Sequence, residues 1–302
     1  MRISSKVEYN KENTSTGCPP KLSAHDERRI TTWIESGRFQ TAVQATDFIN
    51  SMNPEPVCAQ TVRNVLKKNN MKSVVKRKVP LLKKAQRIAR LAFARKYQHW
   101  TVEDWRMVLW SDETKVNRIG SDGHQYTWKR VGEPLSDRTT TPTVKHGGGS
   151  IMVWGCMGWN GAGMLIEVEG KMDSKQYVEI LEAGVMESVE KLDLDKEGFY
   201  FQQDNDPKHT SKRAYNWFQV KGIQLLDWPS QSPDLNPIEH LWCHVKKQLH
   251  SHPSSPNSIH ELWNRMVVEW NKIPAETCQK LIECMPRRCE AVIKAKGGHT
   301  RY

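Results

Sequence analysis

Three acidic residues lie in sequence contexts that suit metal-dependent chemistry. Asp112 follows the short apolar run 106–110, Asp204 follows the run 199–203, and Glu239 lies in the first turn of an expected helix. If the two runs form neighbouring strands about 4.8 Å apart, their terminal carboxylates can share ions spaced about 3.5–4 Å, as in two-metal phosphoryl transfer. Such ions are hard cations that prefer oxygen ligands. The glutamate on a facing helix would complete the ligand set.

Each acidic residue by itself also has an ordinary structural explanation. Asp at the end of a strand is common turn chemistry, and Glu in a first helical turn offsets the helix dipole. The interpretation as a metal site therefore depends on the elements and motifs that surround the three residues.

From residue 105 onward the sequence pattern indicates strands and then alternating helices and strands. The expected strands cover residues 106–110, 124–130, 150–156, 164–168, 199–203 and 223–227. The expected helices cover residues 174–192, 210–219 and a segment from 237, and residues 256–302 are expected to be helical with a loose polar end. This order predicts an α/β (α+β) domain with a mixed sheet and helices on its faces.

The charge of the chain is distributed unevenly. The net charge is +11, from 45 Lys and Arg against 34 Asp and Glu. Residues 1–100 hold 20 basic and 7 acidic side chains, whereas residues 101–302 hold 25 and 27. Such an asymmetry indicates a module that binds a polyanion, joined to a near-neutral domain.

The basic part of the chain contains three short predicted helices. The first begins at the N-cap Ser23, the second begins at Thr41, and the third covers Ala59–Lys68. This arrangement resembles a helix-turn-helix unit, although small three-helix packings also occur without DNA. The residues that the third helix would present to a DNA groove are Gln60, Thr61, Arg63, Asn64, Lys67 and Lys68.

A basic cluster follows these helices and consists of Lys72, Lys76, Arg77, Lys78, Lys83 and Lys84, interrupted by the apolar residues 79–82. A basic helix expected over 83–99 leads on to the rest of the chain. Three interpretations of the cluster remain open, because such a run can bind DNA phosphates, act as a nuclear-import signal, or simply be solvated.

Several classes of protein do not fit the sequence. No apolar run reaches the roughly 18 residues of a membrane span, and residues 1–20 show no secretory signal. The seven cysteines are an odd number spread over a long chain, which argues against a disulfide scaffold, and their spacing with histidine is not that of structural zinc sites. Gly147–Gly149 precede a strand rather than Lys-Ser/Thr and a helix, so they predict no nucleotide cofactor but a tight backbone approach.

Four longer motifs give the strongest indication of function. They are Trp110–Glu113, Val144–Ser150, Gln202–Thr210 (QQDNDPKHT) and Trp228–Trp242 (WPSQSPDLNPIEHLW). All four resemble the Tc/mariner superfamily of cut-and-paste transposases, and the resemblance covers roughly residues 20–302. The 34 residues between Asp204 and Glu239, with Glu as the third acid, are similar to the Tc branch, whereas the mariner branch has Asp there.

The resemblance implies a ribonuclease H-like catalytic domain after the helix-turn-helix domain. It implies that Asp112, Asp204 and Glu239 bind two Mg²⁺ ions, with Mn²⁺ able to substitute. It further implies that the protein acts in the nucleus as a homo-oligomer on double-stranded DNA, cutting at transposon inverted terminal repeats and joining these ends to target DNA. We expect a tail at 1–20, the DNA-binding domain at 21–72, a basic linker and helix at 73–103, and the catalytic domain at 104–302.

One departure from the family concerns the N-terminal region. Gly17–Lys21 occupies the place of the Gly-Arg-Pro-Arg-like linker that separates two helix-turn-helix subdomains, and sixteen residues precede it. We therefore expect only the second subdomain, a truncated DNA-binding region, and weakly sequence-specific binding. Two alternatives to an active transposase are a domesticated or decayed copy that only binds DNA, and a structure-specific nuclease of the same fold.

Overall fold

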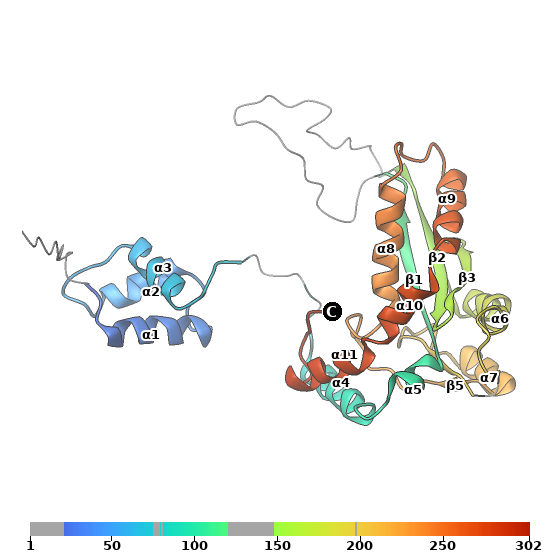
Figure 1. Ribbon diagram of the computed structural model, residues 1–302, viewed down its shortest axis with the longest axis horizontal. Coiled ribbons are helices and arrows are strands. Elements are labelled where there is room, and N and C mark those ends of the chain that lie inside the picture. Colours follow the sequence, from blue (N-terminus) through green and yellow to red (C-terminus); the bar gives the residue numbers. More distant parts are fainter. Residues whose placement is uncertain (1–20, 75–78, 80, 120–147, 197) are drawn as a thin grey trace, which may run out of the picture. The chain divides into compact units, whose positions relative to one another are not determined.

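A computed structural model describes residues 21–74, 79, 81–119, 148–196 and 198–302. The chain divides into two compact units, Met1–Lys78 and Val79–Tyr302, which we call unit 1 and unit 2. Each unit is described by itself (Figure 1). The expected strand at 124–130, Lys76–Lys78 of the basic cluster and Gly17–Pro20 lie outside the described residues.

Unit 1 consists of the three predicted helices, α1 (Ala24–Glu35), α2 (Ala42–Asn50) and α3 (Ala59–Lys68). Ser23 and Thr41 cap α1 and α2 in reciprocal capping boxes, which satisfy backbone N–H groups that a helix start leaves unpaired. The three helices enclose a small core of apolar side chains. The predicted boundaries of the third helix are confirmed.

Unit 2 is built on a five-stranded mixed sheet with the strand order β3-β2-β1-β4-β5. β1 pairs with β2, and β2 with β3, in antiparallel fashion, whereas β1 with β4 and β4 with β5 are parallel. The strands are β1 (Val108–Asn117), β2 (Ser150–Gly158), β3 (Gly161–Val168), β4 (Tyr200–Gln202) and β5 (Gln224–Leu225). The predicted mixed sheet is thus confirmed.

The predicted end of the first strand is wrong. β1 continues seven residues past Trp110, because Ser111 to Asn117 pair with β2 as far as Ser150. Cross-strand pairing outweighs the turn preference of Ser and Asp, which is only a local tendency. Asp112 therefore lies inside a strand, opposite Gly155.

Helices cover both faces of this sheet (Figure 1). α6 (Ser174–Lys191) and α7 (Lys212–Lys221) enclose one apolar core with Leu109 and Trp154. A larger core on the other face contains Trp110, Val153 and side chains from the remaining helices. These are α4 (Lys84–Lys96), α5 (Val102–Arg106), α8 (Ile238–His250), α9 (Ile259–Asn271), α10 (Ala275–Ile282) and α11 (Met285–Lys294).

The side chains of neighbouring residues in one strand, such as Leu109 and Trp110, thus point into opposite cores, as the two-residue period of a strand requires. Trp110, Trp154, Trp217 and Trp242 are all buried in these two cores.

A tight turn leads into β2, as the glycine run predicts. Gly149 has a φ of +89°, and a Cβ on it would lie 2.7 Å from Cδ1 of Ile259. Both features exclude larger residues, because side chains rarely adopt this backbone region. The predicted close approach is confirmed for Gly148 and Gly149, while Gly147 lies outside the described residues.

The C-terminal segment is held in place, so the expectation of a loose polar end is wrong. The guanidinium of Arg90 in α4 is fully buried and donates hydrogen bonds to the carbonyls of Gly297 and Gly298 at 3.1 and 3.0 Å. It also forms a two-pronged ion pair with Asp234, 2.7 Å on each side. Asp234 in turn accepts hydrogen bonds from the backbone N–H and the hydroxyl of Thr300.

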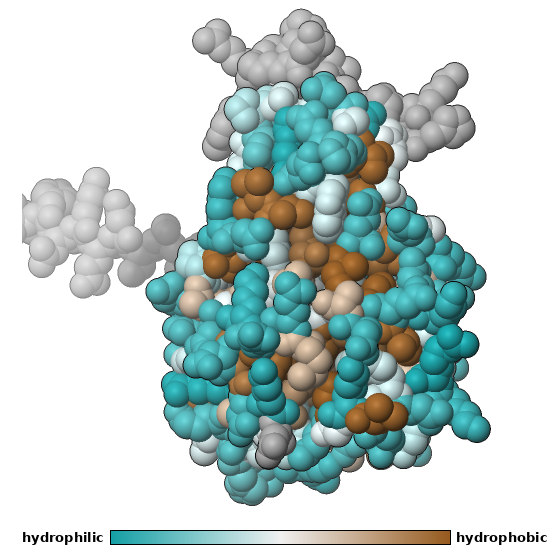
Figure 2. Space-filling model, turned by 90° about the vertical axis from the view of Figure 1, so that its right-hand side faces the viewer, coloured by the Kyte–Doolittle hydropathy of each residue, from teal (hydrophilic) through white to brown (hydrophobic). Residues whose placement is uncertain are grey.

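The face of unit 2 turned toward the viewer in Figure 2 is largely hydrophilic, with separate hydrophobic side chains between the polar ones. Among the described residues, no helix is both long and apolar enough to span a bilayer. The six cysteines among the described residues are free thiols.

Candidate active site

A cavity of about 390 Å³ opens beside the end of β4 and contains all three acidic residues that the sequence singles out. Its walls come from β1, the segment after β4, the loop between β5 and α8, and the first turn of α8. The lining residues are Asp112, Asp204, Asn205, Asp206, Pro207, Trp228, Pro229, Ser230, Gln231, Ser232, Pro233, Asn236 and Glu239.

The strand register explains how two of the acids come together. β1 and β4 are parallel neighbours, as expected, and Trp110 pairs with Gln202. Asp112 and Asp204 each lie two residues beyond this pair. Asp112 is still within β1, whereas Asp204 lies past the end of β4. Glu239, in the first turn of α8, shares a side-chain hydrogen bond with Asp112.

The environment of Asp112 and Glu239 disfavours two negative charges. Burial, together with the charges of Glu239, Glu113 and Asp204, raises the pKa of Asp112 well above its usual value. Burial also raises the pKa of Glu239, even though the hydrogen bond with Asp112 opposes this. Like charges at short range oppose each other's ionisation, and a bound cation would relieve that repulsion.

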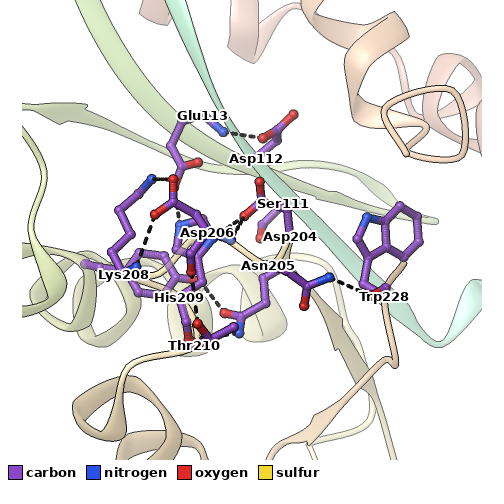
Figure 3. Close-up of polar contacts among 12 residues, drawn as sticks. Ser111, Asp112, Glu113, Asp204, Asn205, Asp206, Lys208, His209, Thr210 and Trp228 are labelled. Atoms are coloured by element: carbon purple, nitrogen blue, oxygen red, sulfur yellow. Dashed lines mark hydrogen bonds and ion pairs between the residues drawn. The ribbon is translucent and has the colours of Figure 1, made fainter. Parts of the chain in front are cut away.

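Asp204 is held by His209, a histidine of the same QQDNDPKHT motif. His209 Nδ1 lies 2.5 Å from Asp204 Oδ1, and its Nε2 lies 3.0 Å from Glu113 Oε1 (Figure 3). Burial alone would raise the pKa of Asp204, but the His209 hydrogen bond, the Asp206 N–H and nearby positive charges lower it overall. Burial alone would lower the pKa of His209, but its two carboxylate partners, Asp204 and Glu113, raise this pKa to about 9.

Two further polar residues of the motif shape the loop. Asn205 donates to the carbonyl of Trp228 at 2.7 Å, and Lys208 forms an ion pair with Asp206 at 2.9 Å (Figure 3). The contact of Glu113 with His209 makes Glu113 an indirect support for Asp204.

The donor set of the cavity fits divalent cations. Three carboxyl groups face one polar cavity, and burial with mutual repulsion favours a compensating charge there. Among the described residues, no three acid, imidazole or thiol groups converge into a ready-made ion site. Asp112 and Glu239 contact each other, whereas Asp204 Oδ1 is engaged by His209 and by the backbone N–H of Asp206.

The structure places most of the predicted DNA-contacting side chains on one helix surface. Gln60, Arg63, Asn64 and Lys67 of α3 are exposed, and Thr61 is partly exposed. Lys68 differs, because its ammonium forms an ion pair with Glu27 at 2.9 Å.

Sequence reasoning missed the side chains that hold the loop before α8. Besides Asp234 and Arg90, Arg288 of α11 is buried and donates to the carbonyl of Asp234 at 2.7 Å and to Nδ1 of His240 at 2.7 Å. The only signal in the sequence is one acid within the Pro-rich motif, Asp234, and its partners lie 144 and 54 positions away. Such distant pairings are invisible to local patterns.

Comparison with known proteins agrees with this geometry. A family model described as a DDE superfamily endonuclease matches residues 107–262, and one described as a transposase, of the helix-turn-helix type, matches residues 27–99. The Tc1 transposase of Caenorhabditis elegans is 41% identical over 276 residues, which cover 91% of this chain and 100% of that protein. The Tc3 transposase of the same species is 30% identical, covering 98% and 88% of the two chains.

The chain belongs to the Tc1/mariner family of transposases. It is accordingly an enzyme with a helix-turn-helix DNA-binding domain and a metal-dependent DDE endonuclease domain. Solved structures of the Mos1 transposase share the fold, which is ribonuclease H-like as predicted. The paired-end complex with the left transposon end has a TM-score of 0.77 at 16% identity, covering 98% of this chain and 83% of that one. The mariner paired-end complex with Mg has a TM-score of 0.75 at 18% identity, with coverages of 97% and 85%.

Proposed function

We propose that this transposase cuts double-stranded DNA at the inverted terminal repeats of its own element and joins the released ends to target DNA. The observation that carries the proposal is the convergence of Asp112, Asp204 and Glu239 on one cavity. Family membership supports the reaction class, and the cavity supports the assignment of these three residues to it.

Asp112, Asp204 and Glu239 would hold two Mg²⁺ ions, with Mn²⁺ able to replace them. When bound, such ions supply Lewis-acid stabilisation of the attacking and leaving oxygens of a phosphoryl transfer. The protein's own residues arrange the ligands. His209 and Glu113 fix the side chain of Asp204, and Asn236 ties the loop before α8 to the carbonyl of Ser111 in β1.

DNA recognition is assigned to α3 of unit 1, whose exposed polar side chains suit a groove. The Mos1 structures are paired-end complexes, which supports action of this chain as a homo-oligomer that brings two ends together. We further propose that the protein works in the nucleus, where its DNA substrate lies.

Cleavage of a defined substrate tests the proposal. The 302-residue protein is incubated with linear DNA that carries the element's terminal repeats, with Mg²⁺, with Mn²⁺ and with a chelator, and the nicked and cut products are separated on gels. We expect cleavage at the repeat ends with either ion, and none with the chelator. DNA with scrambled repeats is the control. Binding without cleavage under all conditions would instead support a copy that acts only as a DNA-binding protein.

Two groups of basic residues should affect DNA binding in different ways. Arg63→Ala should relax sequence preference by about 1–3 kcal/mol at one base pair, since a bidentate base contact is lost. Neutralising Lys76, Arg77 and Lys78 together should reduce the slope of log K against log salt by up to about 2.7, at about 0.9 per phosphate contact. Competition titrations at several salt concentrations measure both effects.

Lys171→Gln is the matched control for these variants, because Lys171 is an exposed lysine outside both α3 and the basic cluster. It should change neither the preference nor the slope. If the triple variant kept the full slope, the cluster would be a nuclear-import signal or a solvated stretch instead.

A further inference from the structure

Two segments of unit 2 hold its net excess of positive charge. Residues 83–96, which form α4 and its N-cap, contain six Lys and Arg and no acid. Residues 285–302 contain five Lys and Arg and one acid, Glu290. The rest of residues 79–302 holds 20 basic and 26 acidic side chains, a net charge of −6. A polyanion that approaches unit 2 is therefore attracted mainly to these two segments.

The two segments lie against each other. A Cβ on Gly297 would be only 2.0 Å from the carbonyl oxygen of Arg87, and Arg90 donates to the carbonyls of Gly297 and Gly298. α4 and α11 are also adjacent in Figure 1. Their positive charges therefore belong to one continuous region of the surface.

Most of the basic side chains of α4 are available to a partner. Arg90 is buried, and Lys96 forms an ion pair with Asp227. Lys84, Arg87 and Arg95 are exposed and form no ion pair within the part of the chain that the structure describes. Their spacings of three and eight residues place them on one side of the helix.

The second segment forms a basic hollow next to α4. Arg287 and Lys294, two turns apart on α11, line a cavity of about 520 Å³ together with Arg301. Thr300, Tyr302 and Glu290 also contribute to its wall. Three cations against one carboxylate leave an excess of positive charge, and the hydroxyl of Tyr302 adds a hydrogen-bond donor that suits phosphate oxygens.

The basic region contacts the loop that also lines the acidic cavity. Arg90 of α4 holds that loop through Asp234, and the ring of Phe93 in α4 lies 5.2 Å from the ring of Trp228. The acidic cavity itself repels phosphate, because four of its lining residues are Asp or Glu. Positive charge near the cavity would offset this repulsion for a DNA end that enters it.

We propose that this region, the α4–α11 basic surface (Lys84, Arg87, Arg95, Arg287, Lys294 and Arg301), binds the phosphate backbone of the DNA whose end enters the acidic cavity. The proposal rests on the proposed function. The contact is independent of sequence, because it reaches phosphates rather than bases. It adds to the binding by unit 1 and brings the duplex to the catalytic unit.

The test compares charge-neutralised variants of the full chain. Arg287, Lys294 and Arg301 are all changed to Gln in one variant, and Lys84, Arg87 and Arg95 in a second. The control changes Lys171, Lys196 and Lys212 to Gln, which are exposed lysines with the same total charge on the α6–α7 side. Binding to terminal-repeat DNA is titrated at several salt concentrations, and circular dichroism melting verifies that each variant is folded.

We expect the first two variants to lower the slope of log K against log salt by up to about 2.7 each, at about 0.9 per lost contact. The control should leave the slope unchanged. An unchanged slope in both folded test variants would overturn the proposal. So would an equal fall in the control, since net charge alone would then explain the effect. A change of sedimentation behaviour at an unchanged slope would assign the surface to a second copy of the chain.

The outcome is separable from that of the proposed function. If the unmodified protein binds DNA but never cuts it, the cleavage proposal fails, while the slope measurement still decides whether the α4–α11 basic surface contacts DNA.

Discussion

Asp204→Asn should abolish divalent-dependent cleavage of terminal-repeat DNA while DNA binding stays nearly intact. The substitution keeps the side-chain volume but removes a charged ligand, and the ions contribute several kcal/mol of transition-state stabilisation. A loss of about 4 kcal/mol corresponds to roughly a thousandfold in rate. Single-turnover cleavage in Mg²⁺, with DNA binding measured in parallel, checks this result. Asp112→Asn and Glu239→Gln should lose cleavage in the same way as Asp204→Asn.

Asp227→Asn is the matched control for this series. Asp227 is exposed and paired with Lys96 on the surface, and it does not line the acidic cavity. The cleavage rate of Asp227→Asn should remain within a few-fold of that of the unmodified protein. Full cleavage by any of the three cavity variants would remove that residue from the proposed ligand set.

Asp234→Ala should destabilise unit 2 by about 3–5 kcal/mol, because it leaves the buried guanidinium of Arg90 without its carboxylate. For a domain of this size the melting temperature should fall by about 6–20 °C, at about 2–4 °C per kcal/mol. Thermal denaturation followed by circular dichroism measures the shift. Asp227→Ala breaks an exposed ion pair of the same type, and it should cost only about 0–1 kcal/mol.

The contribution of Asp234 should also depend on pH in a defined direction. Burial alone would raise the pKa of Asp234, but Arg90 and Thr300 lower it overall. A carboxyl whose pKa is lower in the folded state stabilises the fold above its unfolded pKa, about 3.9. This stability is present at neutral pH and is lost as the pH falls below about 4. The difference in unfolding free energy between the unmodified protein and Asp234→Ala should shrink accordingly, and an equal difference at pH 7 and pH 3 would contradict the assignment.

Local sequence patterns predicted the helices and strands of this fold well where interactions between residues close in sequence determine them. Capping residues such as Ser23 and Thr41 mark helix starts, and the predicted strands before Asp204 and after Gly149 are present. The end of β1 was mispredicted because its last residues are held by β2, more than thirty positions away. A preference for turns could not reveal that pairing.

The same distinction applies to the site. The three acids could be identified because each lies in a long motif, and their convergence follows from parallel pairing of β1 with β4. The contacts of His209 with Glu113, and of Arg90 with Asp234, join residues 96 and 144 positions apart. No periodicity or spacing in the sequence indicates these contacts, so only the three-dimensional structure reveals them.

The attachment of the C-terminal segment to Arg90 has a consequence for the order of folding. Arg90 binds the carbonyl of a residue 207 positions later in the chain, whereas the helices of unit 1 pack within about fifty residues of one another. During synthesis, unit 1 can therefore reach its native state early, since its contacts are local. Two of the hydrogen bonds of the buried Arg90 guanidinium cannot form until residues 297 and 298 have emerged, which makes the catalytic unit the last part to mature. A nascent chain accordingly acquires the capacity to bind DNA before it acquires the capacity to cut it.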